Sequence, residues 1–323
     1  MRSWSLIILI MPILLTALYH SRISLPRAWS TSRFASRLAW TSTLTMSTFQ
    51  HPEYNIPITL PPGLCQSQLL NFHPFKSWLK SLNHSLTTQH TSPTHPFHAL
   101  PYTLRSITVQ SFDLFGRPPN TRLGFVKLTS HISNPAGETL PGSVFLRGPS
   151  VAMLVMLIPE DIAPHETERL EEERHVLLTV QPRIAAGSLE FVELPAGMVD
   201  EEGDFVGQAA AEIREELGMG IGRGELVSLG DLVGDGEEGE LPRAVYPSAG
   251  GCDEYIPIYM HERRVPRQQL GEWTGKLTGL REHGEKITLK LVRMRDLWKE
   301  GARDAKCLAA VALWEGLRRE GKL

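Results

Sequence analysis

The sequence has 323 residues, of which 41% are hydrophobic and 21% are charged, and its formal net charge at pH 7 is −3. These values are ordinary for a globular protein and exclude a collagen-like or wholly disordered chain. A near-neutral chain has no overall attraction to nucleic acid, so we expect no nucleic-acid partner and only local recognition of phosphate.

Residues 1–52 contain no Asp or Glu and carry five arginines among many Ser and Thr. This composition is typical of an organellar transit peptide, and we expect mitochondrial import. The apolar run 6–18 is interrupted by Pro12 and is shorter than the roughly 20 residues that span a bilayer, so secretion or a short anchor are alternatives. A start at Met46 would instead give a cytoplasmic protein. We assign residues 1–60 to a targeting or disordered segment, with no stable membrane partner after targeting.

Residues 61–140 are predicted to hold an N-terminal helix and a small sheet. Pro74 suits the first turn of a helix, and four apolar residues follow it at helical spacing: Phe75, Trp78, Leu79 and Leu82. A linker rich in Thr, His and Pro is expected at 87–101, where the histidine spacing matches no usual metal site. Two runs rich in β-branched residues, 107–115 and 123–132, then predict strands.

Residues 141–323 are predicted to form the main domain. Its strand-like runs lie at 144–158, 176–180, 189–194, 226–229, 255–259 and 287–292. An acidic exposed connection or short helix is expected at 159–174, and longer helices are expected at 206–217 and 304–319. A mixed sheet packed by few helices is an α+β arrangement rather than a doubly wound one.

The segment 193–219 reads ELPAGMVDEEGDFVGQAAAEIREELGM and is the most informative part of the chain. On a helical wheel its apolar residues share one face, while Glu212, Glu215 and Glu216 occupy an adjoining face at i, i+3 and i+4. Such like-charged pairs cost about 0.2–0.5 kcal/mol each on an exposed helix. A hard cation would reverse that sign, so Mg²⁺, with Mn²⁺ as a substitute, is the predicted cofactor. The alternative is an ordinary solvated helix face.

This segment resembles the Nudix box, G-x(5)-E-x(7)-R-E-U-x-E-E-x-G-U, in which U is a bulky apolar residue. Seven of the nine fixed positions fall in register: Gly197, Glu212, Ile213, Glu215, Glu216, Gly218 and Met219. Gly203 stands where the first box Glu belongs, and Ala211 stands where the box Arg belongs. In the family those two groups orient the helix, and we hypothesise that Glu202 and Arg214 replace them. The resemblance implies that Glu212, Glu215 and Glu216 are catalytic metal ligands.

Further segments resemble the ADP-sugar diphosphatase branch of the Nudix hydrolase superfamily: 141–157 (PGSVFLRGPSVAMLVML), 193–197 (ELPAG), 203–207 (GDFVG), 246–254 (YPSAGGCDE) and 284–292 (GEKITLKLV). The resemblance implies a Nudix fold, with a mixed β-sheet sandwiched by helices, and a metal ligand from the carbonyl of Ala196. It implies that Glu285 is the base that activates water, with Glu282 as the second candidate near the substrate. Substrate contacts are expected from Arg183, from Pro247 and, less so than a structural salt bridge, from Arg147.

The function implied by the resemblance is Mg²⁺-dependent hydrolysis of ADP-ribose or ADP-glucose to AMP and a sugar phosphate. Members of the branch are commonly homodimers, and we expect the predicted sheet at 107–132 to help form the interface. Two alternatives remain open. One is a nucleotide-binding protein that has lost turnover, suggested by Gly203 and Ala211, and the other is a Nudix hydrolase of another nucleoside diphosphate derivative.

Overall fold

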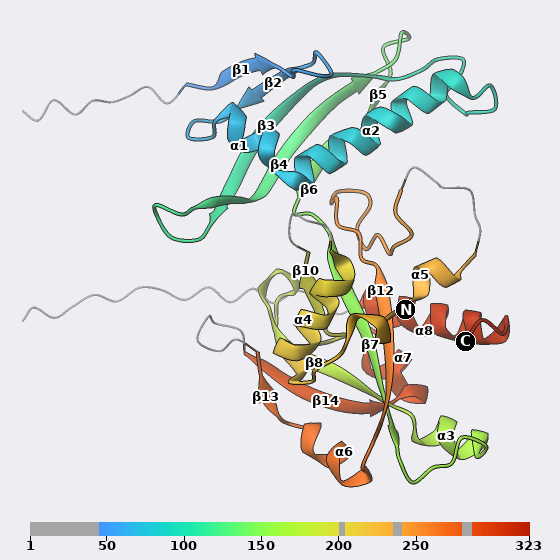
Figure 1. Ribbon diagram of the computed structural model, residues 1–323. Coiled ribbons are helices and arrows are strands. Elements are labelled where there is room, and N and C mark those ends of the chain that lie inside the picture. Colours follow the sequence, from blue (N-terminus) through green and yellow to red (C-terminus); the bar gives the residue numbers. More distant parts are fainter. Residues whose placement is uncertain (1–44, 200–203, 235–240, 280–285) are drawn as a thin grey trace, which may run out of the picture. The chain divides into compact units, whose positions relative to one another are not determined.

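The computed structural model describes residues 45–199, 204–234, 241–279 and 286–323, which contain two β-sheets and their helices (Figure 1). The first sheet has six strands: β1 (Ser47–Gln50), β2 (Pro57–Leu60), β3 (Thr103–Phe115), β4 (Arg122–Ser133), β5 (Thr139–Leu140) and β6 (Ser143–Leu146). The strands are hydrogen-bonded in the order β1-β2-β3-β4-β5, and β6 also pairs with β4. Strand β2 is parallel to β3, whereas β4 is antiparallel to β3, β5 and β6.

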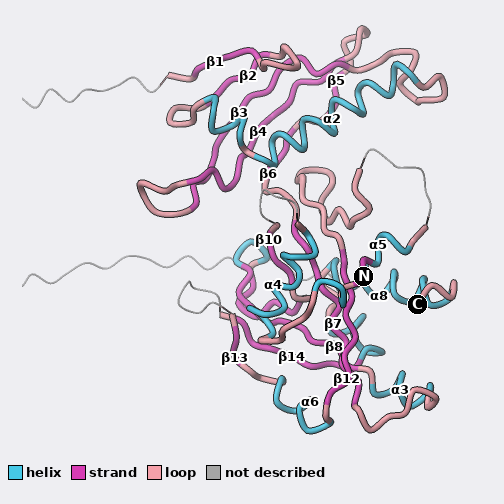
Figure 2. The backbone as a smooth tube through the Cα atoms, in the orientation of Figure 1, coloured by secondary structure: helices cyan, strands magenta, loops and turns pink. Residues whose placement is uncertain are grey.

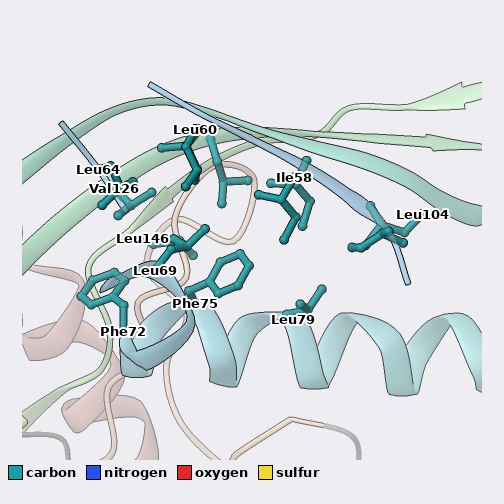
Figure 3. Packing of buried hydrophobic residues seen from close by; sticks show 14 of the residues in the cluster. Ile58, Leu60, Leu64, Leu69, Phe72, Phe75, Leu79, Leu104, Val126 and Leu146 are labelled. Atoms are coloured by element: carbon teal, nitrogen blue, oxygen red, sulfur yellow. The ribbon is translucent and has the colours of Figure 1, made fainter. Parts of the chain in front are cut away.

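One long helix packs on this first sheet. Helix α2 (His73–Thr91) follows the short α1 (Gln66–Asn71) and has a proline in its first turn, as predicted. Phe75 and Leu79 lie four residues apart, so they project from the same side of the helix. Both are buried in one core with Ile58 and Leu104 from the strands (Figure 3).

Folded structure begins earlier than the predicted boundary at residue 61. Strands β1 and β2 lie inside the range 1–60 that composition assigned to targeting. The absence of acidic residues described the segment's charge but not its packing, because Ile58 and Leu60 are buried in the sheet's core.

The predicted linker at 87–101 also begins too early, because α2 continues to Thr91. Gln89 explains the extra turn: its side chain is buried, donates to the Tyr102 carbonyl oxygen at 2.6 Å and accepts from the Tyr102 N–H at 2.8 Å. These two hydrogen bonds tie the end of the helix to the residue that precedes β3.

The second sheet is mixed and has eight strands: β7 (Ser150–Pro159), β8 (His175–Arg183), β9 (Ser188–Glu193), β10 (Ala196–Met198), β11 (Val227–Ser228), β12 (Ile258–Val265), β13 (Leu277–Thr278) and β14 (Ile287–Arg293). Its order is β11-β12-β7-β8-β14-β13, with β9 paired to β8 and β10 paired to β7. Strands β7 and β12 are parallel, whereas β8 is antiparallel to β7, β9 and β14. All ten residues of β7 are buried, as expected for a strand covered on both faces.

Helices cover both faces of this second sheet. Successive residues of a strand point to opposite sides, so alternate residues of β7 pack against different helices. Val151, Met153, Val155 and Leu157 pack with buried residues of α4 (Phe205–Leu217) and α6 (Arg267–Trp273). Ala152, Leu154 and Met156 pack with α5 (Leu229–Leu232), α7 (Leu297–Glu300) and α8 (Ala305–Arg319). Figure 2 shows α4 and α8 on opposite sides of β7. The predicted α+β fold, a mixed sheet between helices preceded by an N-terminal sheet, is confirmed.

The run 144–158 was predicted as one strand and is two, β6 and β7. Gly148 lies between them with φ +82°, a left-handed conformation that favours glycine, and its N–H donates to the Asp253 carboxylate. The run 226–229 was predicted as a strand, but only Val227 and Ser228 form one. The chain enters α5 at Leu229, where the Ser228 hydroxyl accepts a hydrogen bond from the Asp231 N–H. The run predicted at 255–259 becomes a strand only from Ile258 onward.

Short helices complete this part of the chain. Helix α3 (Thr167–Glu173) lies where an acidic connection or short helix was predicted. Helices α5, α6 and α7 were not predicted, since a helix of one or two turns offers too little periodicity to identify. None of the helices in the described ranges has both the length and the apolar character needed to cross a bilayer.

Candidate functional site

Helix α4 is delimited by its two end residues. Asp204 precedes it, and its carboxylate accepts a hydrogen bond from the Gly207 N–H at 3.0 Å, which satisfies one of the free donors of the first turn. Gly218 follows it with φ +68° and closes the last turn. The predicted helix at 206–217 is therefore confirmed to within one residue. Its buried face carries Ala209, Ile213 and Leu217, which pack against β7.

Gly197 brings the backbone of β10 against the side chain of Glu212. A Cβ atom at Gly197 would lie 1.8 Å from Glu212 Oε1, far inside any real contact distance. Gln208, one turn earlier on α4, donates from Nε2 to the same oxygen at 2.7 Å. The glycine allows the close approach, and the glutamine amide helps to orient the carboxylate.

Glu216 is the buried carboxylate of the site. Only 5% of the residue is exposed, and its Oε2 accepts a hydrogen bond from the Ala196 N–H at 3.2 Å. Burial raises the pKa of Glu216 well above its usual value, and the negative charges of Glu212 and Glu193 raise it further. Ala196 and Gly197 are adjacent on β10, so this short strand contacts two of the predicted metal ligands.

The three box glutamates do not share one environment. Glu216 is buried, Glu212 is partly buried and Glu215 is exposed. The helical wheel placed all three on one polar face, but α4 packs so that the side bearing Glu216 turns toward β10. Glu212 and Glu216 therefore form the inner part of the site.

A group of four charged side chains, of which Arg183 is the most exposed, lies beside Glu216. Glu193, at the end of β9, accepts from Arg183 Nε at 2.6 Å and from Lys306 Nζ at 2.9 Å. Lys306 Nζ also lies 2.9 Å from Asp304 Oδ1, and Asp304 Oδ2 accepts from the Leu194 N–H at 3.0 Å. Arg183 was predicted at the site, whereas roles for Glu193, Asp304 and Lys306 were not. The available signal was Asp304, an N-cap residue two positions before a lysine at the start of α8.

The inner part of the site fits a divalent cation. Glu216 is buried beside a second carboxylate, and it accepts a hydrogen bond from the Ala196 N–H. Two such carboxylates are unfavourable together unless a proton or a cation lies between them. Carboxylate and carbonyl oxygens are the ligands that Mg²⁺ prefers. As the side chains stand, the described residues hold no group of three His, Cys, Asp or Glu arranged to bind a metal ion.

Two predicted substrate-binding residues lie in the segments that join the strands. Arg147 Nη1 is 2.5 Å from Glu254 Oε1, and its Nη2 donates to Ser150 Oγ at 2.9 Å. This ion pair confirms the structural role that was predicted for Arg147 in preference to a substrate contact. Pro247 is exposed in the turn that contains Gly250 and Gly251.

The remaining predicted residues divide into two groups. Glu282, Glu285, Glu202 and Gly203 lie outside the described residues, so the assignment of the base stays a prediction. Ala211 is partly buried, and Arg214 is exposed. Replacement of the missing box pair by Glu202 and Arg214 likewise stays a prediction.

Comparison with known proteins identifies the family. The chain is 37% identical over 221 residues to Nudix hydrolase 14, chloroplastic, of Arabidopsis thaliana, an alignment that covers 68% of this chain and 65% of the relative. The chain belongs to the Nudix hydrolase family. Its Nudix helix is α4, and Gly197 and Gly218 are the box glycines on either side of it. The chain covers less than two thirds of the relative's own length.

No protein-family model matches the chain. A crystal structure of ADP compounds hydrolase is similar with a TM-score of 0.40 and 16% sequence identity, covering 68% of this chain and 99% of that chain. A similarity at this level does not indicate a substrate.

Proposed function

We propose that this Nudix protein hydrolyses the diphosphate linkage of an ADP-sugar, ADP-ribose or ADP-glucose, to AMP and a sugar phosphate in the presence of Mg²⁺. The observation that carries the proposal is the burial of Glu216 beside Glu212 on the helix of the Nudix box. A carboxylate buried with a raised pKa beside another carboxylate is typical of a functional site.

Glu212 and Glu216 would hold the cation, and Glu215 and the carbonyl of Ala196 are the further ligands expected from the resemblance. Gly197 and Gln208 fix the position of the Glu212 carboxylate. When bound, Mg²⁺ would neutralise charge on the diphosphate and orient a water molecule.

Arg183 would bind a phosphate of the substrate. Its side chain is 42% exposed and donates to Glu193 through Nε, and among the described residues its two terminal nitrogens form no hydrogen bond. A guanidinium is well suited to phosphate because its planar donors match two phosphate oxygens. Glu285 would activate the attacking water, as the family resemblance implies.

The first test is a comparison of the wild-type protein with Glu216→Gln, using ADP-ribose and ADP-glucose with Mg²⁺. We expect the wild type to release AMP and the variant to lose at least about 100-fold in kcat/KM, because one charged ligand is removed from the inner part of the site. Glu320→Gln is the matched control, since Glu320 is exposed near the end of the chain. Equal activity of wild type and Glu216→Gln would contradict the proposal.

A second function is favoured by Gly203 and Ala211, which replace two orienting residues of the box. In that case the protein binds a nucleotide without hydrolysing it. Calorimetry with ADP-ribose separates the two functions, because binding without release of AMP supports the nucleotide-binding protein. A panel of other nucleoside diphosphate derivatives tests the third alternative, a Nudix hydrolase with a different substrate.

Mitochondrial location and a homodimer remain predictions from composition and resemblance. Imaging of the full chain with a C-terminal fluorescent protein tests the first, and the word chloroplastic in the relative's name makes plastids the comparison compartment. Light scattering of the purified protein measures the oligomeric state.

A further inference from the structure

Lys306, at the start of α8, is linked by hydrogen bonds and ion pairs to residues 193 and 194, just before the Nudix box. Its Nζ bonds to Glu193 Oε2 and to Asp304 Oδ1, each at 2.9 Å. Asp304 in turn accepts from the Leu194 N–H, the residue directly after Glu193. The two carboxylates and the lysine therefore hold one another through both side chains and backbone, although Glu193 and Lys306 are 113 residues apart in sequence.

The two cations bound to Glu193 are not equivalent. The Lys306 side chain is 13% exposed and is fixed by two carboxylates, whereas the Arg183 side chain is 42% exposed and bonds to Glu193 alone among the described residues. Each takes a different oxygen: Arg183 Nε is at Oε1 and Lys306 Nζ is at Oε2. The lysine is thus the anchored partner, and the arginine is the partner that reaches toward solvent.

The negative charges of Glu193 and Asp304 keep Lys306 protonated although its side chain is largely buried. Burial by itself would lower the pKa of Lys306, but attraction to Glu193 and Asp304 outweighs it and raises the pKa. Burial also disfavours charged Arg183, and the hydrogen bond and charge of Glu193 again outweigh it and raise the pKa. Both groups are therefore cationic at neutral pH.

We propose that Lys306 is a positioning residue for Arg183: it occupies one oxygen of Glu193, so that Arg183 is held through Nε and keeps its terminal nitrogens for a phosphate of the ligand. The physical reason is competition for one carboxylate. A guanidinium next to a carboxylate with both oxygens available tends to bind both in a fork. Without Lys306, Arg183 would turn its terminal nitrogens to Glu193. This inference rests on the proposed function, since it assumes that Arg183 binds phosphate.

The test is a double-mutant cycle with Lys306→Met and Arg183→Ala, and ADP with Mg²⁺ is the probe in calorimetry. We expect Lys306→Met to weaken ADP binding about tenfold when Arg183 is present and less than about twofold when it is replaced by alanine. With ADP-ribose as substrate, KM should rise by a similar factor while kcat stays within about threefold. Lys290→Met is the control, because Lys290 forms an exposed ion pair with Glu300.

The proposal would be overturned if Lys306→Met weakened ADP binding by the same factor with and without Arg183, because that loss would reflect a general effect on the structure. It would also be overturned if Lys306→Met left the ADP affinity unchanged. Thermal unfolding confirms that each variant is folded at the temperature of the titration. If Lys306→Met does not fold, Lys306→Ala, which also has no donor for Glu193 Oε2, allows the same comparison. A wild type that binds ADP but hydrolyses no ADP-sugar contradicts the proposed enzyme and still allows Lys306 to be tested; a wild type that binds no ADP contradicts both.

Discussion

Gly197 is the residue at which a single added carbon would most directly disturb the site. Its missing side chain allows Glu212 Oε1 to approach within 1.8 Å of the position that a Cβ would occupy. The glycine does not have a positive φ, so its role is space and not backbone conformation. The family motif requires a glycine here, and the geometry of β10 against α4 supplies the reason.

We expect Gly197→Ala to lower kcat/KM by about 10- to 100-fold, because the Glu212 carboxylate must move by an ångström or more. The free energy of unfolding should fall by about 1–3 kcal/mol from overpacking. Steady-state kinetics and thermal unfolding measure the two effects. Gly224→Ala is the control, since a Cβ there meets nothing within 4 Å. Full activity of Gly197→Ala would show that Glu212 does not need this position.

The N-terminal end of helix α4 is held by Asp204, and the position of the helix determines where its glutamates lie. The Asp204 carboxylate accepts from the Gly207 N–H at 3.0 Å and also forms an ion pair with Arg223. Because both partners of the ion pair are substantially exposed, we expect the hydrogen bond at the cap to contribute more than the ion pair.

Asp204→Ala should reduce the free energy of unfolding by about 1 kcal/mol, the usual effect of losing an N-cap. Asp204→Asn retains the side-chain oxygen that accepts from Gly207 and removes the charge, so its effect should be smaller than about 0.5 kcal/mol. Urea denaturation of the two variants measures the difference. Equal losses for Ala and Asn would mean that the ion pair with Arg223, and not the cap, stabilises the start of α4.

The stability of the whole molecule is linked to its site through Glu216. Burial first, and then the charges of Glu212 and Glu193, raise the pKa of this carboxyl group in the folded protein. In the unfolded chain its pKa is near the ordinary value of about 4.3. The folded state therefore keeps a proton that the unfolded state loses, and stability falls as pH rises from the unfolded pKa to the folded pKa.

We expect Glu216→Gln to raise the Tm relative to the wild type in EDTA, by a difference that grows above about pH 4 and becomes constant beyond the folded pKa. The amide oxygen can still accept from the Ala196 N–H, so the packing is retained. Adding Mg²⁺ should stabilise the wild type more than the variant. A Tm difference that is independent of pH in EDTA would contradict a raised pKa at this residue.

Residues close together in the chain were enough to predict the elements whose limits depend on local chemistry. The predicted limits of α4 were correct within one residue, because its apolar residues recur at helical spacing and Gly218 follows its last turn. The spacing from Gly197 to Gly218 also indicated the family before any contact was known. The same local signals predicted the N-terminal helix and the long strands β3, β4, β7, β8 and β14.

Which of these residues are buried together depends on contacts between segments that are distant in the chain. Glu215 and Glu216 are neighbours of the same type in the sequence, and their difference in burial depends on how α4 packs against β10. The bond between Lys306 and Glu193 joins residues 113 positions apart, which no local pattern specifies. Burial and long-range pairing depend on the meeting of distant segments, and side-chain periodicity describes only one segment at a time.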